Sequence, residues 1–402
     1  MNEPLASASR TIAVVFARLG PYHLARLRGA TEVLARERVA LASIAIAGTD
    51  RVYAWDRVDP TSGQTRVLFP QESYERISDA RLGVAVHASL DEIDPMAVAL
   101  PGWAFEEARA GLDWCRKMNR PAILMSESSR HDHFRVWIRE TMKRDLVRRF
   151  GAALVGGSPH RDYARHLGVP RAAIFTGYDV VDNDYFQRGA DRIRLSVAEE
   201  RLARKLPARF ILSSSRFVPQ KNLAGLVQGY ARYVASTPDS RDLVLCGDGE
   251  LKASLQHLAQ TLGVGHRIYW PGFVQYPELP AYYALADAFI LASTTEPWGL
   301  VVNEVMASGL PVLVSSRCGC ASDLVREGEN GFTFDPHHPE AIAQALQKLP
   351  GSAAELERMG QASRRIISAY SPQAFGEGLL NAARVALARA GSNALALSEV
   401  GL

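Results

Sequence analysis

The two residues best suited to chemistry are Glu296 and Glu304, which lie eight positions apart in the segment T-E-P-W-G-L-V-V-N-E. A carboxylate can accept hydrogen bonds from two neighbouring hydroxyls at once, which suits it to a sugar or a ribose diol. Glu296 falls in a polar loop, where we expect it to accept from sugar hydroxyls. Glu304 falls about one turn into a predicted helix, where we expect it to accept from a ribose. The pair predicts recognition of a sugar-containing ligand.

The elements around these acids predict the edge of a parallel sheet. Residues 287–292 form an apolar run typical of a buried parallel strand. Gly299 precedes a helix expected over residues 300–308, and a further strand is expected over 311–315. Ligands of open α/β sheets bind beyond the carboxyl ends of the strands, and a helix N-terminus there favours phosphate. We therefore expect the amides of Gly299 and Leu300 to help hold a diphosphate.

The segment that contains both acids resembles the E-x7-E signature of retaining glycosyltransferases of family 4. The resemblance covers E-P-W-G-L, with Trp298, and continues through A-S-G-L-P-V. It implies the GT-B fold, an α/β architecture of two Rossmann-like, doubly wound domains facing an interdomain cleft. It also implies transfer of a sugar from a nucleotide-diphospho-sugar, most often a UDP-sugar, with retention of configuration. The alternative from the residues alone is an ordinary buried αβ unit with two exposed acids.

The same resemblance assigns further residues of the second half to the donor. Arg216 and Lys221 match an arginine and a lysine that grip the donor diphosphate in the family. Two cations can neutralise such a leaving group without a metal, so no metal or other cofactor is expected. Asn222 is expected to cap the helix that follows. The other implied donor contacts are Gly247, Gly272, Phe273 and Val274, the last two near the nucleobase.

The first half of the chain predicts a strand, a glycine loop and a helix, but it lacks the G-x-G-x-x-G fingerprint of dinucleotide binding. By the resemblance, Gly20 approaches the donor diphosphate or the acceptor; a plain tight turn is the alternative. His23 and Arg18 are expected at the surface or as capping residues. Glu127 stands near the position where the family usually has a histidine, and we assign it to the donor or acceptor site.

Residues 134–150 predict a basic amphipathic helix. Its apolar stripe includes Met142, and its cations could contact anionic lipid or an anionic acceptor. A core-packed helix with a solvated basic face is the alternative. The acceptor implied by the resemblance is a saccharide of polysaccharide or glycolipid biosynthesis, and the basic helix favours a lipid-linked one.

Two short clusters could be taken for metal sites, and neither is expected to be one. In His131-Asp-His133 the histidines are two residues apart, which does not place them on one helix face. Asp182-Asn-Asp184 has the D-x-D form of metal-dependent glycosyltransferases with a single Rossmann domain. We expect a polar loop there.

The composition of the 402 residues is that of a globular protein, with 47% apolar residues and a net charge of +3 that does not indicate a nucleic-acid partner. Four cysteines indicate a reducing compartment, and Cys318-Gly-Cys320 is expected to be structural. No apolar run is long enough to cross a membrane, and residues 1–10 lack a signal core. We expect a cytoplasmic protein, with peripheral contact at the inner face of the membrane left open.

The expected domains are 1–187 for the acceptor and 188–371 for the donor. A terminal helix over 372–390 completes the first domain, and a tail covers 391–402. Two rival functions remain: a GT-B epimerase or phosphorylase acting on a sugar phosphate, and a GT-B module that binds a nucleotide sugar without turnover. Glu127 in place of a histidine is the feature that favours the second rival.

Overall fold

The computed structural model describes residues 10–49, 65–129 and 137–391. The chain divides into two compact units, Met1–Val181 with Tyr370–Leu402, and Asp182–Ala369. We call them unit 1 and unit 2 and describe each by itself. Almost all of residues 1–10 and of the expected tail over 391–402 lie outside the described residues.

Unit 1 is built on a parallel sheet of seven strands in the order β3-β2-β1-β4-β5-β6-β7. Apart from the edge strand β3, which is half-buried and more polar, the strands are mostly buried and apolar because helices cover both faces of the sheet. Their bounds are Thr11–Arg18 (β1), Ala40–Thr49 (β2), Thr65–Ser73 (β3), Ala97–Pro101 (β4), Ala122–Ser126 (β5), Ala152–Val155 (β6) and Ile174–Thr176 (β7). The strand order reverses between β1 and β4, which pair directly.

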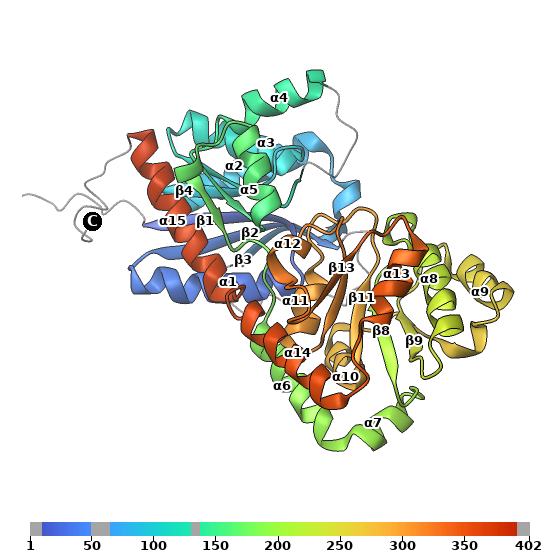
Figure 1. Cartoon of the computed structure of the whole chain (residues 1–402). Coiled ribbons are helices and arrows are strands. Elements are labelled where there is room, and N and C mark those ends of the chain that lie inside the picture. The colour runs from blue at the N-terminus through green and yellow to red at the C-terminus, as the bar shows by residue number, and fades with distance from the viewer. Residues whose placement is uncertain (1–9, 50–64, 130–136, 392–402) are drawn as a thin grey trace, which may run out of the picture. The chain divides into compact units, whose positions relative to one another are not determined.

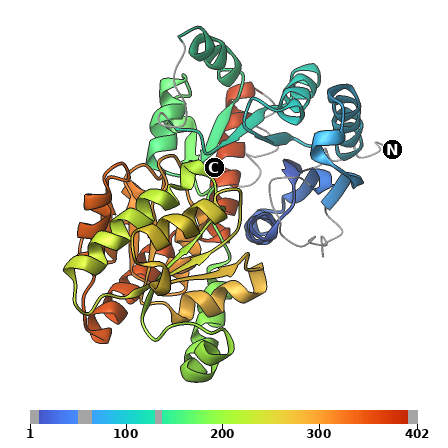
Figure 2. The same ribbon diagram turned by 90° about the vertical axis from the view of Figure 1, so that its right-hand side faces the viewer.

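The helices of unit 1 fall on the two faces of this sheet. Their bounds are Pro21–Arg36 (α1), Asp79–Ile93 (α2), Glu106–Lys117 (α3), Trp137–Val147 (α4), Ser158–His166 (α5) and Pro372–Ala390 (α15). Helices α1 and α15 pack against each other, as do α2 and α3. The red terminal helix α15 lies among the blue and green elements of unit 1 in both views (Figures 1 and 2).

Glycines allow the close approach of α15 to α1. A β-carbon on Gly29 would lie 2.1 Å from the carbonyl oxygen of Pro372, and one on Gly376 would lie 2.8 Å from the carbonyl oxygen of Gly29. The apolar side of α15, including Phe375 and Leu379, is buried in the core of unit 1. The last helix of the chain is thus an integral part of the first unit.

Unit 2 contains a parallel sheet of six strands in the order β10-β9-β8-β11-β12-β13. Their bounds are Phe210–Ser214 (β8), Asp242–Cys246 (β9), Ile268–Gly272 (β10), Ala288–Leu291 (β11), Val312–Ser315 (β12) and Gly331–Phe334 (β13). Helices α8 (Leu223–Ser236), α9 (Lys252–Thr261) and α13 (Pro339–Gln347) pack together. A second group is α6 (Asn183–Ile193), α10 (Leu279–Leu285), α11 (Leu300–Ala307) and α14 (Ala353–Ile367); the short helices are α7 (Val197–Ala203) and α12 (Ala321–Leu324).

The prediction of two Rossmann-like, doubly wound domains is confirmed, because both sheets are parallel and the strand order reverses once in each. The expected boundary at residue 187 falls inside α6, whereas the compact units divide at Asp182. The expected polar loop at Asp182-Asn-Asp184 is wrong. Asp182 is the N-cap of α6 and accepts a hydrogen bond from the amide of Tyr185 at 3.0 Å, and Asp184 pairs with Arg188 one turn on.

Replacing Gly29 with alanine tests the fit between α1 and α15. The added β-carbon collides with backbone, which cannot rotate away, so we expect a loss of about 1–3 kcal/mol in the free energy of unfolding. The matched control is Gly83→Ala in α2, where the nearest atoms would be 3.7 Å away and a small gain is expected from helix propensity. Urea unfolding of both variants measures the difference; equal stabilities would contradict the close-packing argument.

Candidate functional site

The loops that follow β8 and β11 meet at the point where the sheet of unit 2 changes direction. Strands β8 and β11 are neighbours, with β9 outside one and β12 outside the other. A crevice forms at such a reversal because the two loops leave in opposite directions. The amide of Thr294, after β11, donates to the carbonyl of Gln220, after β8, at 2.9 Å. This bond fixes the two loops against each other.

Lys221 and Glu296 form an ion pair across this junction. Their side chains are 17% and 14% exposed, so the pair is largely shielded but open to solvent on one side. The hydroxyl of Ser293 donates to the same carboxylate oxygen, Oε2, at 3.0 Å. The structure therefore brings together two of the residues assigned to the site, with the lysine charge neutralised by the acid.

Arg216 lies in the same loop as Lys221, and its side chain is exposed. Within the described part of the chain, its guanidinium makes no ion pair or hydrogen bond. Gly247 packs closely against the backbone of this loop. Its φ is +137°, and a β-carbon added to it would lie 1.9 Å from the carbonyl oxygen of Ser215. Gly247 thus serves close backbone packing beneath Arg216.

The N-terminus of α11 points into the same region. Its N-cap, Gly299, has a φ of +102°, a left-handed conformation that favours glycine. The first amides of a helix have no intrahelical acceptor, so those around Leu300 are suited to bind an anion. Trp298 is buried, and its indole N–H donates to the side chain of Asn303 at 2.8 Å. Trp298 therefore anchors the helix start and presents no surface to a ligand.

The C-G-C segment supports the Glu296 loop from behind. The amide of Gly319 donates to the carbonyl of Glu296 at 3.0 Å, and the amide of Cys320 to that of Trp298 at 3.2 Å. Cys318 and Cys320 are buried free thiols, and burial raises the pKa of both well above the usual value. Neutral, inaccessible thiols agree with the structural role that their spacing predicts.

Glu304 is placed differently from the open ribose acceptor that its sequence position predicts. Its side chain is buried, at 1% exposure, and it accepts a hydrogen bond from the hydroxyl of Tyr283 in α10. The ribose contact stays a prediction. Asn222 also departs from expectation: it occupies the N-cap of α8, but its side chain donates to the carbonyl of Pro336 at 2.7 Å instead of capping the helix.

The residues assigned to the nucleobase lie at the carboxyl ends of β9 and β10. The amide of Gly247 donates to the carbonyl of Gly272 at 2.8 Å, which joins two of the assigned glycines. Gly272 has a φ of +86°. Phe273 is 41% exposed, unusually open for a large apolar side chain, whereas Val274 is nearly buried. Of these, Phe273 is the one placed to stack on a planar ligand.

In unit 1, the backbone conformation of Gly20 is one that any residue can adopt. Its φ is −142°, which is extended backbone, and an added β-carbon would lie 3.7 Å from the nearest side-chain atom. Two residues, Leu19 and Gly20, join β1 to α1, so the connection is the plain turn given as the alternative, and a ligand contact of Gly20 stays a prediction. His23 caps the start of α1, as one of its predicted roles, because its Nδ1 accepts from the amide of Gly20 at 3.1 Å. Burial, with Arg26 and Arg18 nearby, lowers the pKa of His23 to about 3.

Glu127 is exposed and follows β5 at the carboxyl edge of the unit 1 sheet. It lies near Asp179, which follows β7 and was not assigned from the sequence. Asp179 is 1% exposed, and a guanidinium nitrogen of Arg26 lies 3.3 Å from its carboxylate oxygen Oδ1. The same guanidinium group lies 4.5 Å from the ring centre of Tyr178. Burial and the charge of Glu127 raise the pKa of Asp179 well above its usual value, against the effect of Arg26. This edge therefore carries a buried contact between an arginine and a carboxyl group next to an exposed acid.

Gly156, after β6, leaves the space that Asp179 occupies, since an added β-carbon would lie 2.0 Å from the carboxylate oxygen Oδ2. Asp179 stands in the segment G-Y-D directly after β7, which no expectation from the sequence assigned to a site. Arg26 and Gly156 were not assigned either, because only the folded chain brings α1, β6 and β7 together.

The described part of the chain contains no group of three or more metal-ligating side chains close enough to hold an ion. His131 and His133 lie outside the described residues. No helix in the ranges described is long and apolar enough to span a membrane.

Helix α4 covers Trp137–Val147, and the earlier residues of the expected basic helix lie outside the described ranges. Two of its cations face the protein. Lys143 donates to the hydroxyl of Tyr163 in α5 at 3.3 Å, and Arg144 lies 3.1 Å from a ring nitrogen of His166. Met142, expected in the apolar stripe, is 68% exposed. The helix thus packs partly through its basic side chains and leaves an apolar one outside.

The lowered pKa of His23 predicts a pH-dependent stability. The unfolded chain binds a proton near pH 6.5, whereas the folded chain does so only near pH 3. Stability from this group is therefore complete above about pH 6.5 and falls as the pH drops towards 3. In His23→Gln, a glutamine can accept from the same amide without titrating. The melting temperature of the parent should fall between about pH 7 and about pH 4.5, and that of His23→Gln should fall less. We expect the two decreases to differ by at least about 2–4 °C, which corresponds to about 1 kcal/mol in the free energy of unfolding for a unit of this size.

The control for this comparison is His257→Gln, an exposed histidine of α9. It should leave the acid dependence of melting as in the parent. An identical acid dependence in His23→Gln and the parent would contradict the buried, neutral state of His23.

Comparison with known proteins finds a family model that matches most of unit 2. Residues 198–366 match the family model described as "Glycosyl transferases group 1". The chain is 29% identical over 249 residues to a GDP-mannose-dependent alpha-(1-6)-phosphatidylinositol monomannoside mannosyltransferase from Mycolicibacterium smegmatis, covering 59% of this chain and 64% of that protein. The chain spans 26% to 64% of the length of eight curated relatives.

Two solved structures share the fold over most of the chain. Sucrose-phosphate synthase from Thermosynechococcus elongatus superposes with a TM-score of 0.70 at 19% identity, covering 94% of this chain and 99% of that one. The Anabaena protein Alr3699/HepE, in complex with UDP and glucose, gives 0.66 at 17% identity, covering 92% and 98%. At these identities the likeness concerns the fold. The chain therefore has the GT-B fold, and residues 198–366 of its second unit match the group 1 glycosyltransferase family model.

Proposed function

We propose that this chain is a retaining glycosyltransferase of family 4, which moves a sugar from a nucleotide-diphospho-sugar to an acceptor hydroxyl in glycolipid or polysaccharide synthesis. The observation that carries the proposal is the Lys221–Glu296 pair at the reversal point of the unit 2 sheet. It lies within the segment that matches the group 1 family and beside the N-terminus of α11.

The ion pair supplies a rationale for donor binding. A diphosphate carries more negative charge than one carboxylate and can accept several charge-assisted hydrogen bonds. On binding, it takes Lys221 from Glu296, and the exposed Arg216 and the first amides of α11 complete its coordination. Glu296 is then free to accept hydrogen bonds from the sugar hydroxyls. Binding of the leaving group and recognition of the sugar are thereby coupled through one residue pair.

The proposed reaction keeps the configuration at the anomeric carbon. The bond from this carbon to the diphosphate oxygen breaks, and the acceptor hydroxyl attacks from the same face. The departing phosphate oxygen receives the hydroxyl proton, so no separate base is required. Because negative charge builds up on the diphosphate in the transition state, Lys221 and Arg216 supply the main electrostatic stabilisation. The two cations also supply the charge that a divalent metal would otherwise provide.

We propose UDP as the nucleotide. The Anabaena structure contains UDP and glucose, which supports this choice, whereas the mycobacterial relative is named for GDP-mannose. The exposed ring of Phe273 offers a stacking surface that accepts any base. The base is therefore the part of the proposal that most needs measurement.

We propose that unit 1 binds the acceptor at the carboxyl edge of its sheet, where Glu127 is exposed. The mycobacterial relative is named for a phosphatidylinositol mannoside, which supports a glycolipid acceptor. Peripheral membrane contact through residues 134–150 belongs to the same proposal, and Met142, exposed on α4, supports it.

Melting in the presence of UDP-, GDP- and ADP-sugars, each with EDTA, tests the donor site. A ligand at about a hundred times its dissociation constant stabilises the protein by about 2.7 kcal/mol. We expect a rise with UDP-sugars that EDTA does not reduce. A rise only after metal is added would contradict the metal-free site, and no rise with any nucleotide sugar would contradict the donor assignment.

Lys221→Ala tests catalysis apart from binding. Removing one preorganised charge from a leaving-group site is expected to lower kcat about 100- to 1,000-fold. The control is Lys348→Ala, an exposed lysine at the end of α13, which should retain parental turnover. Turnover of Lys221→Ala close to the parental rate would contradict the assignment of Lys221 to the leaving group. Nucleotide-sugar binding by the parent without transfer or donor hydrolysis would favour a non-catalytic binding module.

A further inference from the structure

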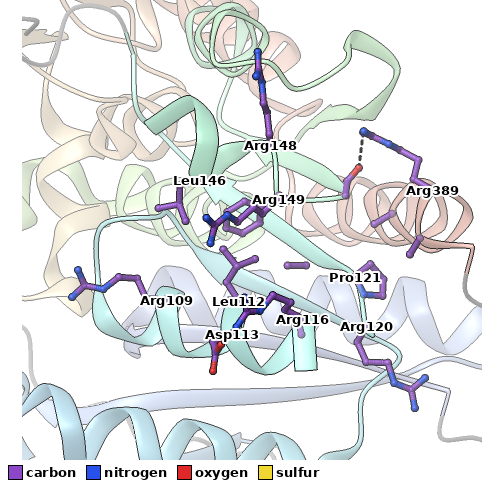
Figure 3. Close-up of a pocket in the computed structure, with 16 residues that line it drawn as sticks. Arg109, Leu112, Asp113, Arg116, Arg120, Pro121, Leu146, Arg148, Arg149 and Arg389 are labelled. Carbon is purple, nitrogen blue, oxygen red and sulfur yellow. Dashed lines mark hydrogen bonds and ion pairs between the residues drawn. The ribbon is translucent and has the colours of Figure 1, made fainter. Parts of the chain in front are cut away.

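Unit 1 contains a cavity of about 560 Å³ at the amino edge of its sheet. Residues that precede β5 and β6 form one side, and the C-terminal turns of α3, α4 and α15 form the other (Figure 3). Glu127, Gly156 and Asp179 lie at the carboxyl edge of the same sheet, so the cavity is separate from the proposed acceptor site. Its volume is within the range of small-molecule sites, roughly 300–1,000 Å³.

The cavity combines an apolar floor with a cationic rim. The floor includes Leu112, Leu146, Phe150 and Ala386. The rim carries six arginines and one acid, Asp113; the arginines are Arg109, Arg116, Arg120, Arg148, Arg149 and Arg389.

Three of the six arginines are already neutralised by carboxylates. Arg109 pairs with Glu106 at 2.8 Å, Arg116 with Asp113 at 3.1 Å, and Arg120 with Asp94 at 3.1 Å.

The other three, Arg148, Arg149 and Arg389, have no carboxylate within ion-pair distance in the described part of the chain. Arg389 donates to the carbonyl of Gly151 at 2.9 Å, and no acid offsets its charge. Arg148 and Arg149 are exposed and follow the last residue of α4.

Helix C-termini explain only part of this positive charge. Each contributes roughly half a negative charge, so the ends of α3, α4 and α15 together offset roughly one and a half of the three unpaired cations. The remainder, roughly one and a half positive charges, matches a phosphate monoester, which carries about −1.5 to −2 at neutral pH. Arginine is also the residue best suited to phosphate, because its planar fork donates two parallel hydrogen bonds.

The arrangement of the side chains selects two arginines as the anchors. Arg149 lies over the apolar floor near Leu146 and Leu112, and Arg389, at the edge of the cavity, is directed to the carbonyl of Gly151 (Figure 3). Arg109 and Arg120 point outwards in the same view. A ligand seated here would place its anionic group near Arg149 and an apolar group on the floor.

We propose that this arginine-rimmed cavity binds a phosphate monoester that carries an apolar group, as a second ligand site of the chain. The ligand is either a small phosphorylated metabolite or a lipid whose head group is a phosphate monoester. The site does not depend on the proposed glycosyl transfer, because all its residues belong to unit 1.

Binding to the full chain tests the site with three probes. These are inorganic phosphate, phosphatidylcholine vesicles that contain phosphatidic acid, and vesicles of equal surface charge made with phosphatidylglycerol, a phosphodiester. We expect saturable binding of phosphate or phosphatidic acid and weaker binding of phosphatidylglycerol. Neutralising the two anchors, in Arg149→Gln/Arg389→Gln, should weaken binding of the preferred probe at least about tenfold, since each charge-assisted hydrogen bond contributes about that factor.

The matched control is Arg165→Gln/Arg171→Gln, which removes two exposed arginines of unit 1 outside the cavity and should bind as the parent does. Lys221→Ala should also retain phosphate binding at the cavity, so failure of the donor assignment and failure of this site are distinguishable. Binding of phosphate and phosphatidic acid indicates a general phosphate monoester site, and binding of phosphatidic acid alone indicates a lipid head group. Absence of saturable binding, equal affinity for both vesicles, or an equal loss in the control would each overturn the proposal.

Discussion

The reversal of strand order between β8 and β11 is the constraint on which the site of unit 2 depends. Only there do two loops leave the sheet in opposite directions, so that one can supply a cation and the other an acid to the same crevice. The bond from Thr294 to Gln220 sets the separation of these loops, and the C-G-C segment holds the second loop from behind. Backbone hydrogen bonds therefore position the two loops, and the ion pair with Ser293 beside it positions the side chains of Lys221 and Glu296.

An ion pair in such a crevice keeps both side chains charged although they are largely buried. A lysine and a glutamate that are mostly buried would each be costly alone, and pairing offsets much of that cost. A ligand that offers a diphosphate to the lysine and hydroxyls to the acid satisfies both at once. A bare phosphate satisfies only the lysine and leaves the carboxylate without its cation. This difference gives a physical basis for selecting a whole nucleotide sugar over free phosphate.

The sequence was sufficient for the strands and for most of the helices, because parallel strands buried on both faces are continuous apolar runs such as residues 287–292. It also located the loops that carry Arg216, Lys221 and Glu296, since these follow directly from strand ends. What it could not supply were contacts between distant segments. Arg26 reaches Asp179 across 153 positions, and Tyr283 covers Glu304 from another helix. Local patterns also misassigned Asp182-Asn-Asp184, where a helix cap and a polar loop have the same composition.

The two edges of the unit 1 sheet have opposite electrostatic character. The carboxyl edge carries two acids, Glu127 and Asp179, and the guanidinium group of Arg26 there contacts Asp179. The amino edge gathers arginines because three helices end there, and cations at helix C-termini are favourable. Arg149 stands two residues after the last residue of α4, over the apolar floor, and the unpaired cations at this edge exceed the negative charge that the three helix ends supply. A surplus of guanidinium groups in that place is better explained by an anionic ligand than by the helices.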